Sequence, residues 1–209
     1  MSDLNEKRAH YPRVSDIIGK QNERELRNIP LEVLANACVR GQKVHDYCTA
    51  WVRNLWITDV EEEYKPYLEA FTDWAKEHIE ECHHSSVRLY DDEKRFTGEF
   101  DMIVKLRGSD NIVLLDIKTS HSPSKSWPIQ LAAYGHLCQI NGYKFNSIAN
   151  LHLKKVDTKL REKKQGKSVT STFPQCRAIL MTHEDIAHYW DIFSSALKCY
   201  DYFDRKEVK

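Results

Sequence analysis

No stretch of this chain is apolar enough to cross a membrane, because charged residues interrupt every hydrophobic run well short of the about 20 residues that a spanning helix needs. The amino-terminal segment MSDLNEKRAH is polar and lacks the apolar core of a signal peptide. The 6 cysteines are scattered, without the spacing of a disulfide framework or a metal site. We therefore expect a cytoplasmic protein in a reducing environment, with no membrane partner.

The chain also has no net charge, with 31 basic and 31 acidic residues, which argues against unspecific binding of polyanions. The charges are nevertheless uneven. Residues 61–82 are rich in glutamate, whereas the segment 154–167, KKVDTKLREKKQGK, holds seven Lys or Arg and two acidic residues. This segment is either a solvated, mobile hairpin tip or a surface that grips a phosphate backbone, and one loop can be both.

The 209 residues suffice for one domain with a substantial core, and 41% hydrophobic with 30% charged residues is ordinary for such a domain. The chain has no internal repeats and no low-complexity segment. Hydrophobic periodicity predicts helices at about 26–54, 60–82, 128–141 and 182–203, and strands near 86–91, 96–106, 111–118, 147–154 and 176–181.

This order of elements predicts a single α/β domain over residues 1–209, with a mixed β-sheet flanked by helices and an N-terminal helical portion. Residues 1–10 are expected to be loose, and 154–169 to form a basic mobile loop. Thr182 is the expected N-cap of the closing helix, with acidic residues in its first turn.

Residues 97–119, TGEFDMIVKLRGSDNIVLLDIKT, read as a β-hairpin around the turn-forming segment 107–111. A two-residue loop at Gly108 and Ser109 would place Asp101 opposite Asp116 and Glu99 opposite Lys118. One face then pairs Ile103 with Leu114, and the other is apolar throughout, pairing Phe100 with Ile117, Met102 with Leu115 and Val104 with Val113. A slip of one residue would move Asp101 to the face opposite Asp116.

Two carboxylates and a lysine at the end of a buried sheet are costly unless something pairs with them. Mg²⁺ suits them, since it takes carboxylate oxygens together with water and phosphate. Lys118 would hold or deprotonate the attacking water, or stabilise the phosphate in the transition state. Glu99 is either an additional metal ligand or a partner for Lys118. The hairpin thus has the parts of a metal-dependent phosphodiesterase.

The acid-x-Lys triplet has little weight alone, because it recurs in charge-rich surroundings at Glu63-Tyr64-Lys65, Asp92-Glu93-Lys94, Asp157-Thr158-Lys159, Glu162-Lys163-Lys164 and Asp204-Arg205-Lys206. Only Asp116-Ile117-Lys118 ends a run of β-forming apolar residues. A strand-end ion pair would explain that triplet equally well. The upstream Gly98-x-x-Asp101 in matching register favours a site.

The helix expected at 128–141 begins with Ser126 as a plausible N-cap and Pro128 in the first turn. Gln130 and Tyr134 are four residues apart and share a face near the positive end of the helix dipole, which suits phosphate. Core packing is the alternative for Tyr134. Trp127 would either stack on a base or anchor the helix start.

Taken together, Gly98-x-x-Asp101, Asp116-x-Lys118 and Gln130-x-x-x-Tyr134 resemble the motifs of the PD-(D/E)XK nuclease superfamily, in particular its RecB-type branch with the phage exonucleases. Two N-terminal features are also similar to that branch: the segment 11–18, YPRVSDII, and Gly41-x-x-x-His45 on a helix. The resemblance spans roughly residues 11 to 155. The chain departs from the pattern at 98–100, where the residue before the aspartate is usually valine or small.

The resemblance implies a restriction-endonuclease-like core and a Mg²⁺- or Mn²⁺-dependent DNA nuclease, most simply an exonuclease in phage-type recombination, repair or degradation. It would act in the host cytoplasm if a phage encodes it. A restriction-type or structure-specific endonuclease, and a non-catalytic DNA-binding protein on the same fold, are the alternatives. The sequence leaves open polarity, strand preference, processivity, the pathway, and whether copies of the chain or a recombination protein are partners.

The resemblance also implies roles for individual residues. Asp101, Asp116 and the Ile117 carbonyl would bind the metal with support from His45, which by itself would be taken for a structural histidine. Lys118 would assist the attacking water, and Gln130 and Tyr134 would orient Lys118 or the phosphate. The DNA contacts would come from Lys154, Lys155, Lys159, Arg161, Lys163, Lys164 and Trp127.

Some members of the superfamily carry an iron–sulfur cluster on one N-terminal and three C-terminal cysteines. Here the C-terminal side offers Cys176 and Cys199, which are far apart, so no cluster is expected.

Overall fold

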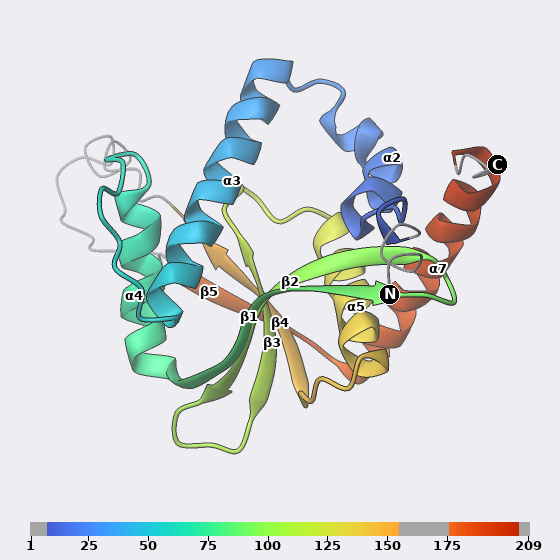
Figure 1. The fold of residues 1–209 in the computed structure, drawn as a ribbon. Helices are drawn as coiled ribbons and strands as arrows, with labels where there is room; N and C mark the ends of the chain where they lie inside the picture. Colours follow the sequence, from blue (N-terminus) through green and yellow to red (C-terminus); the bar gives the residue numbers. More distant parts are fainter. Residues whose placement is uncertain (1–7, 155–175, 205–209) are drawn as a thin grey trace, which may run out of the picture.

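The computed structural model describes residues 8–154 and 176–204. A five-stranded sheet in the order β1-β2-β3-β4-β5 runs through its centre. Helices cover both faces: α3 and α4 lie on one side, and α2, α5 and α7 on the other (Figure 1). No helix in the described part of the chain is long and apolar enough to span a membrane. The predicted α/β architecture, a mixed sheet between helices, is confirmed.

The sheet is mixed because its third and fourth strands run parallel and the other neighbours run antiparallel. A parallel pair needs a crossover connection, and α5 (Ser126–Ile140) supplies it. The strands are β1 (Ile79–Asp91), β2 (Phe96–Leu106), β3 (Ile112–Lys118), β4 (Ser147–Leu153) and β5 (Cys176–Met181).

The N-terminal helices differ from the predicted ones. Instead of one helix at 26–54, α2 (Val14–Leu26) ends where that helix was expected to begin, and α3 (Leu31–Val52) follows. Pro30 is the N-cap of α3, with φ −56° and ψ 140°, so the chain is extended between the two helices. Proline tolerates the start of a helix but not its interior, since it lacks an N–H group. The predicted helix is thus present as α3 with a later start, and α2 was not predicted.

The second predicted helix, at 60–82, is shorter in the structure: α4 covers Lys65–His78. Ile79 is the C-cap of α4 and also the first residue of β1, where it pairs with Leu106. Residues 79–82 were thus assigned to the wrong kind of element. Pairing with β2 overrides their helical pattern.

The closing helix α7 (His183–Phe203) begins as predicted. Thr182 is its N-cap and accepts a hydrogen bond from the Asp185 N–H, while Asp185 accepts one from the Thr182 N–H. This reciprocal capping box satisfies two backbone donors that would otherwise lack partners. In α5, by contrast, Ser126 is the first helical residue rather than the N-cap.

Two hydrophobic clusters fill the space on either side of the sheet. The cluster under α2, α5 and α7 includes Ile103, Leu114 and Ile148. The cluster under α3 and α4 includes Met102, Val104 and Leu115. Consecutive residues of a strand therefore enter opposite clusters, which fixes the face that each polar side chain takes.

The register of the hairpin is confirmed where the two strands pair: Met102 lies opposite Leu115, Ile103 opposite Leu114 and Val104 opposite Val113. The loop is wider than predicted, because Leu106 N–H donates to the Asn111 carbonyl at 2.9 Å and residues 107–110 form the turn. Leu106 and Asn111 are also opposite each other in the predicted register. The wider loop therefore leaves the register unchanged.

The prediction of which sheet face each side chain takes is wrong for part of β2, because the alternation of side chains along this strand is interrupted at Asp101. Phe100 packs into the same cluster as Ile103 and not with Met102, contrary to the prediction. On β1, Ser86 has a positive φ of 48° at the point opposite Asp101. Such a local break in the pleat re-aims a side chain, and here it re-aims the Asp101 carboxylate.

Candidate active site

The Asp101 carboxylate bridges two elements of the protein. Its Oδ2 accepts a hydrogen bond from the Ile117 N–H at 2.5 Å, so the side chain takes the place of a ladder bond between β2 and β3. Its Oδ1 lies 2.9 Å from Nδ1 of His45. Asp101 therefore joins the end of β3 to helix α3.

His45 of α3 is the partner of Asp101 in this contact. Its Nε2 donates to the Ile117 carbonyl at 2.8 Å, and Val44 and Cys48, which are fully buried, hold this part of α3 against the core. Both ring nitrogens face oxygen acceptors, which favours the doubly protonated imidazole. Burial lowers the pKa of His45, but the charge and hydrogen bond of Asp101 raise it, and the net result lies above the usual value.

Asp116 is 2% exposed and belongs to β3. Its Oδ2 forms an ion pair with the Lys118 ammonium nitrogen at 2.7 Å, and this buried oxygen makes no hydrogen bond among the described residues. Burial raises the pKa of Asp116, and the neighbouring Asp101 adds to this, while Lys118 opposes it. The contact with Lys118 is thus an ion pair that leaves one lone pair unsatisfied.

Lys118, Gln130 and Tyr134 form a hydrogen-bonded chain. The Lys118 ammonium donates to Gln130 Oε1 at 2.6 Å, and Gln130 Nε2 donates to the Tyr134 hydroxyl at 2.7 Å. Burial raises the pKa of Tyr134 well above its usual value, as do the charges of Asp116 and Asp101. The hydroxyl therefore stays protonated and fixes the amide that orients Lys118.

Gly98 explains how Tyr134 reaches the sheet. A Cβ atom built on Gly98 would lie 2.8 Å from Tyr134 Cε1 and 2.9 Å from Leu137 Cδ1, closer than such atoms approach. Glycine at this position of β2 is thus required by the close packing of α5. Gly41 has no such constraint, since its Cβ would meet Thr119 Oγ1 at 3.9 Å.

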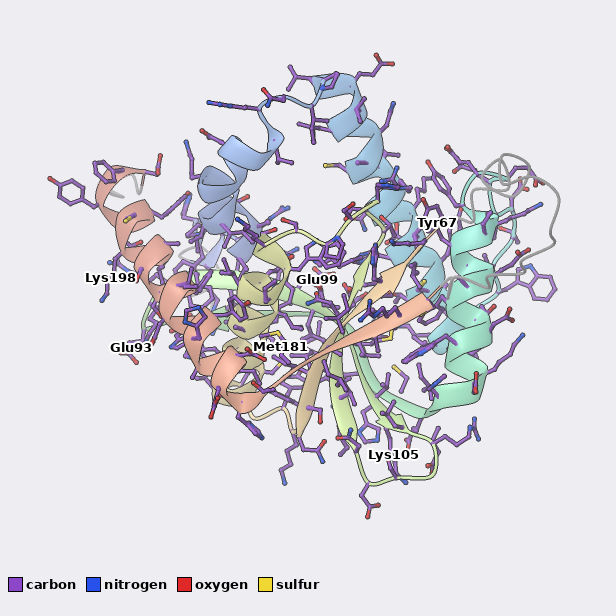
Figure 2. All side chains as sticks on the ribbon, turned by 180° about the vertical axis from the view of Figure 1, so that it is seen from behind. Tyr67, Glu93, Glu99, Lys105, Met181 and Lys198 are labelled. Atoms are coloured by element: carbon purple, nitrogen blue, oxygen red, sulfur yellow. The ribbon has the colours of Figure 1, made fainter. Side chains whose placement is uncertain are left out.

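Glu99 pairs with a residue outside the predicted site, although its charge still contributes to the raised pKa of Tyr134. It accepts a hydrogen bond from Arg88 of β1 at 2.9 Å, and its side chain is 44% exposed. In the predicted register it would face Lys118, but the change of facing at Asp101 turns this part of β2 the other way. The pairing of Glu99 with Lys118 was wrong. Figure 2 labels Glu99 and also Lys105, which lies beside the hairpin turn.

Trp127 is 6% exposed and packs edge-on against His152, with ring centroids 4.9 Å apart. Its ring is covered and offers no face for a base, so it anchors the start of α5, which was the alternative reading. Lys154 is exposed at the end of β4. The other basic residues proposed for DNA contacts, between 155 and 164, lie outside the described residues.

The arrangement fits a divalent cation by its donor chemistry. Asp101, Asp116 and the Ile117 carbonyl offer oxygen atoms only, which hard cations such as Mg²⁺ and Mn²⁺ prefer. The buried Asp116 Oδ2 pairs with the Lys118 ammonium group but makes no hydrogen bond among the described residues, so a lone pair is left that a metal cation can take. In the part of the chain that is described, no three His, Cys, Asp or Glu side chains form a preformed cage. Two carboxylates with a carbonyl would need water or phosphate to complete the shell.

Carboxylates, a backbone carbonyl and a lysine at the end of a mixed sheet define the class of metal-dependent phosphodiesterases. A comparison with protein families identifies a smaller group within this class: the model of the PD-(D/E)XK nuclease superfamily matches residues 10–189. The chain belongs to this superfamily, whose members generally use divalent metal ions and act on DNA. No curated protein sequence matches the chain.

Two solved structures match most of the chain. SSO0001 is 13% identical, with a TM-score of 0.42, and the match covers 89% of this chain and 75% of the other. A Eubacterium rectale protein, described as a candidate exonuclease, is 12% identical, with a TM-score of 0.46 and coverage of 81% and 72%. Similarity at this level carries no argument about function.

Sequence reasoning passed over two buried polar residues on β4, Asn150 and His152. Asn150 pairs with Asp116 across the parallel ladder, and His152 pairs with Lys118. His152 donates from Nε2 to the Ser120 carbonyl at 2.6 Å, which holds the chain that leaves β3. The available signal was the pattern of β4 itself, SIANLHL, where two polar side chains interrupt a fully buried strand.

Proposed function

We propose that this protein is a divalent-metal-dependent deoxyribonuclease that hydrolyses phosphodiester bonds, and that it acts as an exonuclease in phage-type DNA recombination, repair or degradation. The observation that carries the proposal is the buried Asp116 oxygen without a hydrogen bond, next to a lysine that Gln130 holds in place. A structural ion pair would have no need for a third residue to orient its lysine.

Asp101, Asp116 and the Ile117 carbonyl would hold the ion, Mg²⁺ or Mn²⁺, which when bound lowers the pKa of a water molecule and neutralises charge on the phosphate. His45 keeps the Asp101 carboxylate and the Ile117 carbonyl in a fixed mutual position through its two hydrogen bonds. Lys118 projects from the same end of β3 and is 14% exposed, so its ammonium group can meet a phosphate or the attacking water.

The substrate would be gripped outside this centre by basic residues. Lys154 is exposed at the end of β4, and the segment that follows it is the most basic of the chain. Neutralising Lys155, Lys159, Arg161, Lys163 and Lys164 together should weaken DNA binding and reduce its dependence on salt. The cleavage rate at saturating DNA should change little, because phosphate contacts position the duplex without taking part in the chemistry.

The direct test is Lys118→Ala, assayed with linear duplex DNA in Mg²⁺ and in Mn²⁺, with a chelator as the blank. We expect cleavage to fall by at least about 100-fold, since positioned proton donors and charge stabilisers contribute on that scale. Lys105→Ala is the matched control: Lys105 lies on β2 at the hairpin turn and pairs only with the half-exposed Glu80 among the described residues. If Lys118→Ala cuts as fast as wild type, the assignment fails.

A panel of linear, nicked, closed-circular and single-stranded DNA then separates the modes of cutting. An exonuclease needs an end and leaves closed circles intact. Cleavage of closed circles would indicate an endonuclease, and binding of DNA without cleavage in either metal would indicate a non-catalytic protein on this fold.

A further inference from the structure

Three buried side-chain atoms have no hydrogen-bond partner among the described residues: Arg40 Nε, Asp116 Oδ2 and Asn150 Oδ1. Two of the three belong to residues that pair directly across neighbouring strands, because Asp116 of β3 lies opposite Asn150 of β4. Asn150 is 3% exposed and Asp116 is 2% exposed. Two acceptors without a hydrogen bond therefore belong to neighbouring residues in the interior of the sheet. One of these residues is Asp116, a metal ligand in the proposed function.

The two side chains share a face of the sheet. Ile148, two residues before Asn150, packs into the cluster under α5 together with Leu114, which is two residues before Asp116. Ala149 and Leu151 enter the opposite cluster. Paired residues on adjacent strands are about 4.8 Å apart, so an asparagine and an aspartate on one face can reach each other.

A buried asparagine whose oxygen has no hydrogen bond destabilises a strand, because that oxygen has lost its water partners without a replacement. The other polar residues of β4 have partners: Ser147 donates to Asn111 Oδ1, and His152 donates to the Ser120 carbonyl. Rotating the Asn150 amide by 180° about its terminal bond exchanges Oδ1 for Nδ2 without changing its shape. In that orientation the amide can offer an N–H donor to the Asp116 carboxylate, whose Oδ2 makes no hydrogen bond among the described residues.

We propose that Asn150 is a positioning residue of the active site, whose amide Nδ2 donates to the Asp116 carboxylate and fixes its orientation toward the cation. This inference rests on the proposed function. Hydrogen bonds that hold a ligating carboxylate tune metal affinity, because they select the rotamer in which its free lone pair points into the site. Asn150 would thus act on Asp116 from β4 as His45 acts on Asp101 from α3.

Asn150→Ala removes the amide and tests the proposal by Mn²⁺ binding, measured by titration calorimetry without DNA, and by cleavage kinetics as a function of Mn²⁺. We expect the Mn²⁺ dissociation constant, and the Mn²⁺ concentration for half-maximal cleavage, to rise by about tenfold or more. The KM for DNA should stay as in wild type. Asn150→Ser, which returns a donor to this position, should recover part of the affinity.

Ile148→Val is the matched control on the same strand and face, and it should leave Mn²⁺ binding unchanged. Asn150→Leu keeps the branched shape of the side chain without the amide and must behave as Asn150→Ala does. Wild-type Mn²⁺ affinity in a folded Asn150→Ala or Asn150→Leu protein overturns the inference, as does a loss of stability alone.

The two proposals fail differently. If wild type binds Mn²⁺ but does not cut DNA, the proposed function is wrong, and the titration still tests Asn150. If wild type cuts DNA and Asn150→Ala binds Mn²⁺ equally well, only the role of Asn150 is wrong. If wild type binds no Mn²⁺, both are wrong.

Discussion

His45 of α3 and Asp101 of β2 are joined by a hydrogen bond of 2.9 Å, although 56 positions separate them in the sequence. The other ring nitrogen of His45 donates to the Ile117 carbonyl on β3. One imidazole thus holds two oxygen-bearing groups from neighbouring strands at a fixed separation. A histidine so placed contributes to the site by geometry even before any metal is considered.

Replacing His45 by alanine should therefore weaken metal activation. We expect the metal concentration for half-maximal cleavage to rise by about tenfold or more, because Asp101 loses the partner of its Oδ1. A metal titration of the cleavage rate measures this. His83→Ala serves as the control, since His83 is exposed and its only partner among the described residues is Glu81. Equal titration curves for wild type and His45→Ala would contradict the role of the imidazole.

The chain from Lys118 through Gln130 to Tyr134 predicts graded losses. Lys118→Ala should be the most damaging, Gln130→Ala should cost about 10- to 100-fold because it frees the lysine, and Tyr134→Phe should cost several-fold because it acts only through Gln130. Single-turnover cleavage rates at saturating metal give the ranking. A loss in Tyr134→Phe as large as that in Lys118→Ala would show instead that Tyr134 contacts the substrate.

Gly98→Ala should destabilise the protein and slow cleavage together. The new methyl group would lie 2.8 Å from the Tyr134 ring, so α5 or the ring must move, and overpacking of this kind costs about 1–3 kcal/mol. Urea denaturation measures the first effect and the single-turnover rate the second. If the variant is as stable as wild type, the packing of α5 on β2 has been misjudged.

Gly135→Ala provides the contrast on α5. Its added Cβ would meet Phe145 Cζ at 3.7 Å, an ordinary contact, and alanine favours a helix by about 1 kcal/mol over glycine. This variant should be as stable as wild type or more so. It should also cut normally, since the added methyl group would meet Phe145 and no site residue within 4 Å beyond its chain neighbours.

The stability of the protein should fall in mild acid through His152. Burial lowers the pKa of His152 below its usual value of 6.5, although its bond to the Ser120 carbonyl opposes this. The unfolded chain then binds a proton more readily than the folded one. The contribution of His152 to the free energy of unfolding therefore decreases as the pH falls below about 6.5. His152→Gln should lose less stability than wild type between about pH 7.5 and pH 5.5.

Urea denaturation of both proteins at the two pH values measures the difference. His45, whose pKa is raised, titrates in the same window with the opposite sign, but it is present in both proteins, so their difference reports His152. Asp92 and Asp185 have lowered pKa values and titrate below their usual value of 3.8, outside this window. Parallel losses in wild type and His152→Gln would mean that His152 keeps an ordinary affinity for protons in the folded protein.

The hairpin shows how far local patterns reach. The alternation of residues 102–104 and 113–115 predicted their pairing correctly, because burying one residue on each face permits a single register. The same reasoning misplaced Phe100 and Glu99. The strand changes its facing at Asp101, where Ser86 of β1 adopts a positive φ, and the hairpin sequence has no signal for a break that a third strand induces.

The helices divide in a similar way. The start of α7 follows from Thr182 and Asp185, two residues that cap one another and need nothing from the rest of the chain. The end of α4 at His78 does not follow from local sequence. Residues 79–82 continue the helical pattern of apolar residues but form a strand that pairs with β2. Local capping can be predicted from the sequence. Whether a segment continues a helix or joins a sheet depends instead on pairing with a strand that is distant in the sequence.

The sequence by itself determined which chemistry is available: two carboxylates and a lysine on paired strands, followed by Gln130 and Tyr134 at helical spacing. These depend on periods of two and of about four residues, which are properties of the backbone. Only the tertiary structure decided which of the polar residues meet. It brought His45 to Asp101, gave Glu99 to Arg88, covered Trp127 and set Asn150 beside Asp116, because contacts between elements far apart in sequence depend on how whole faces pack.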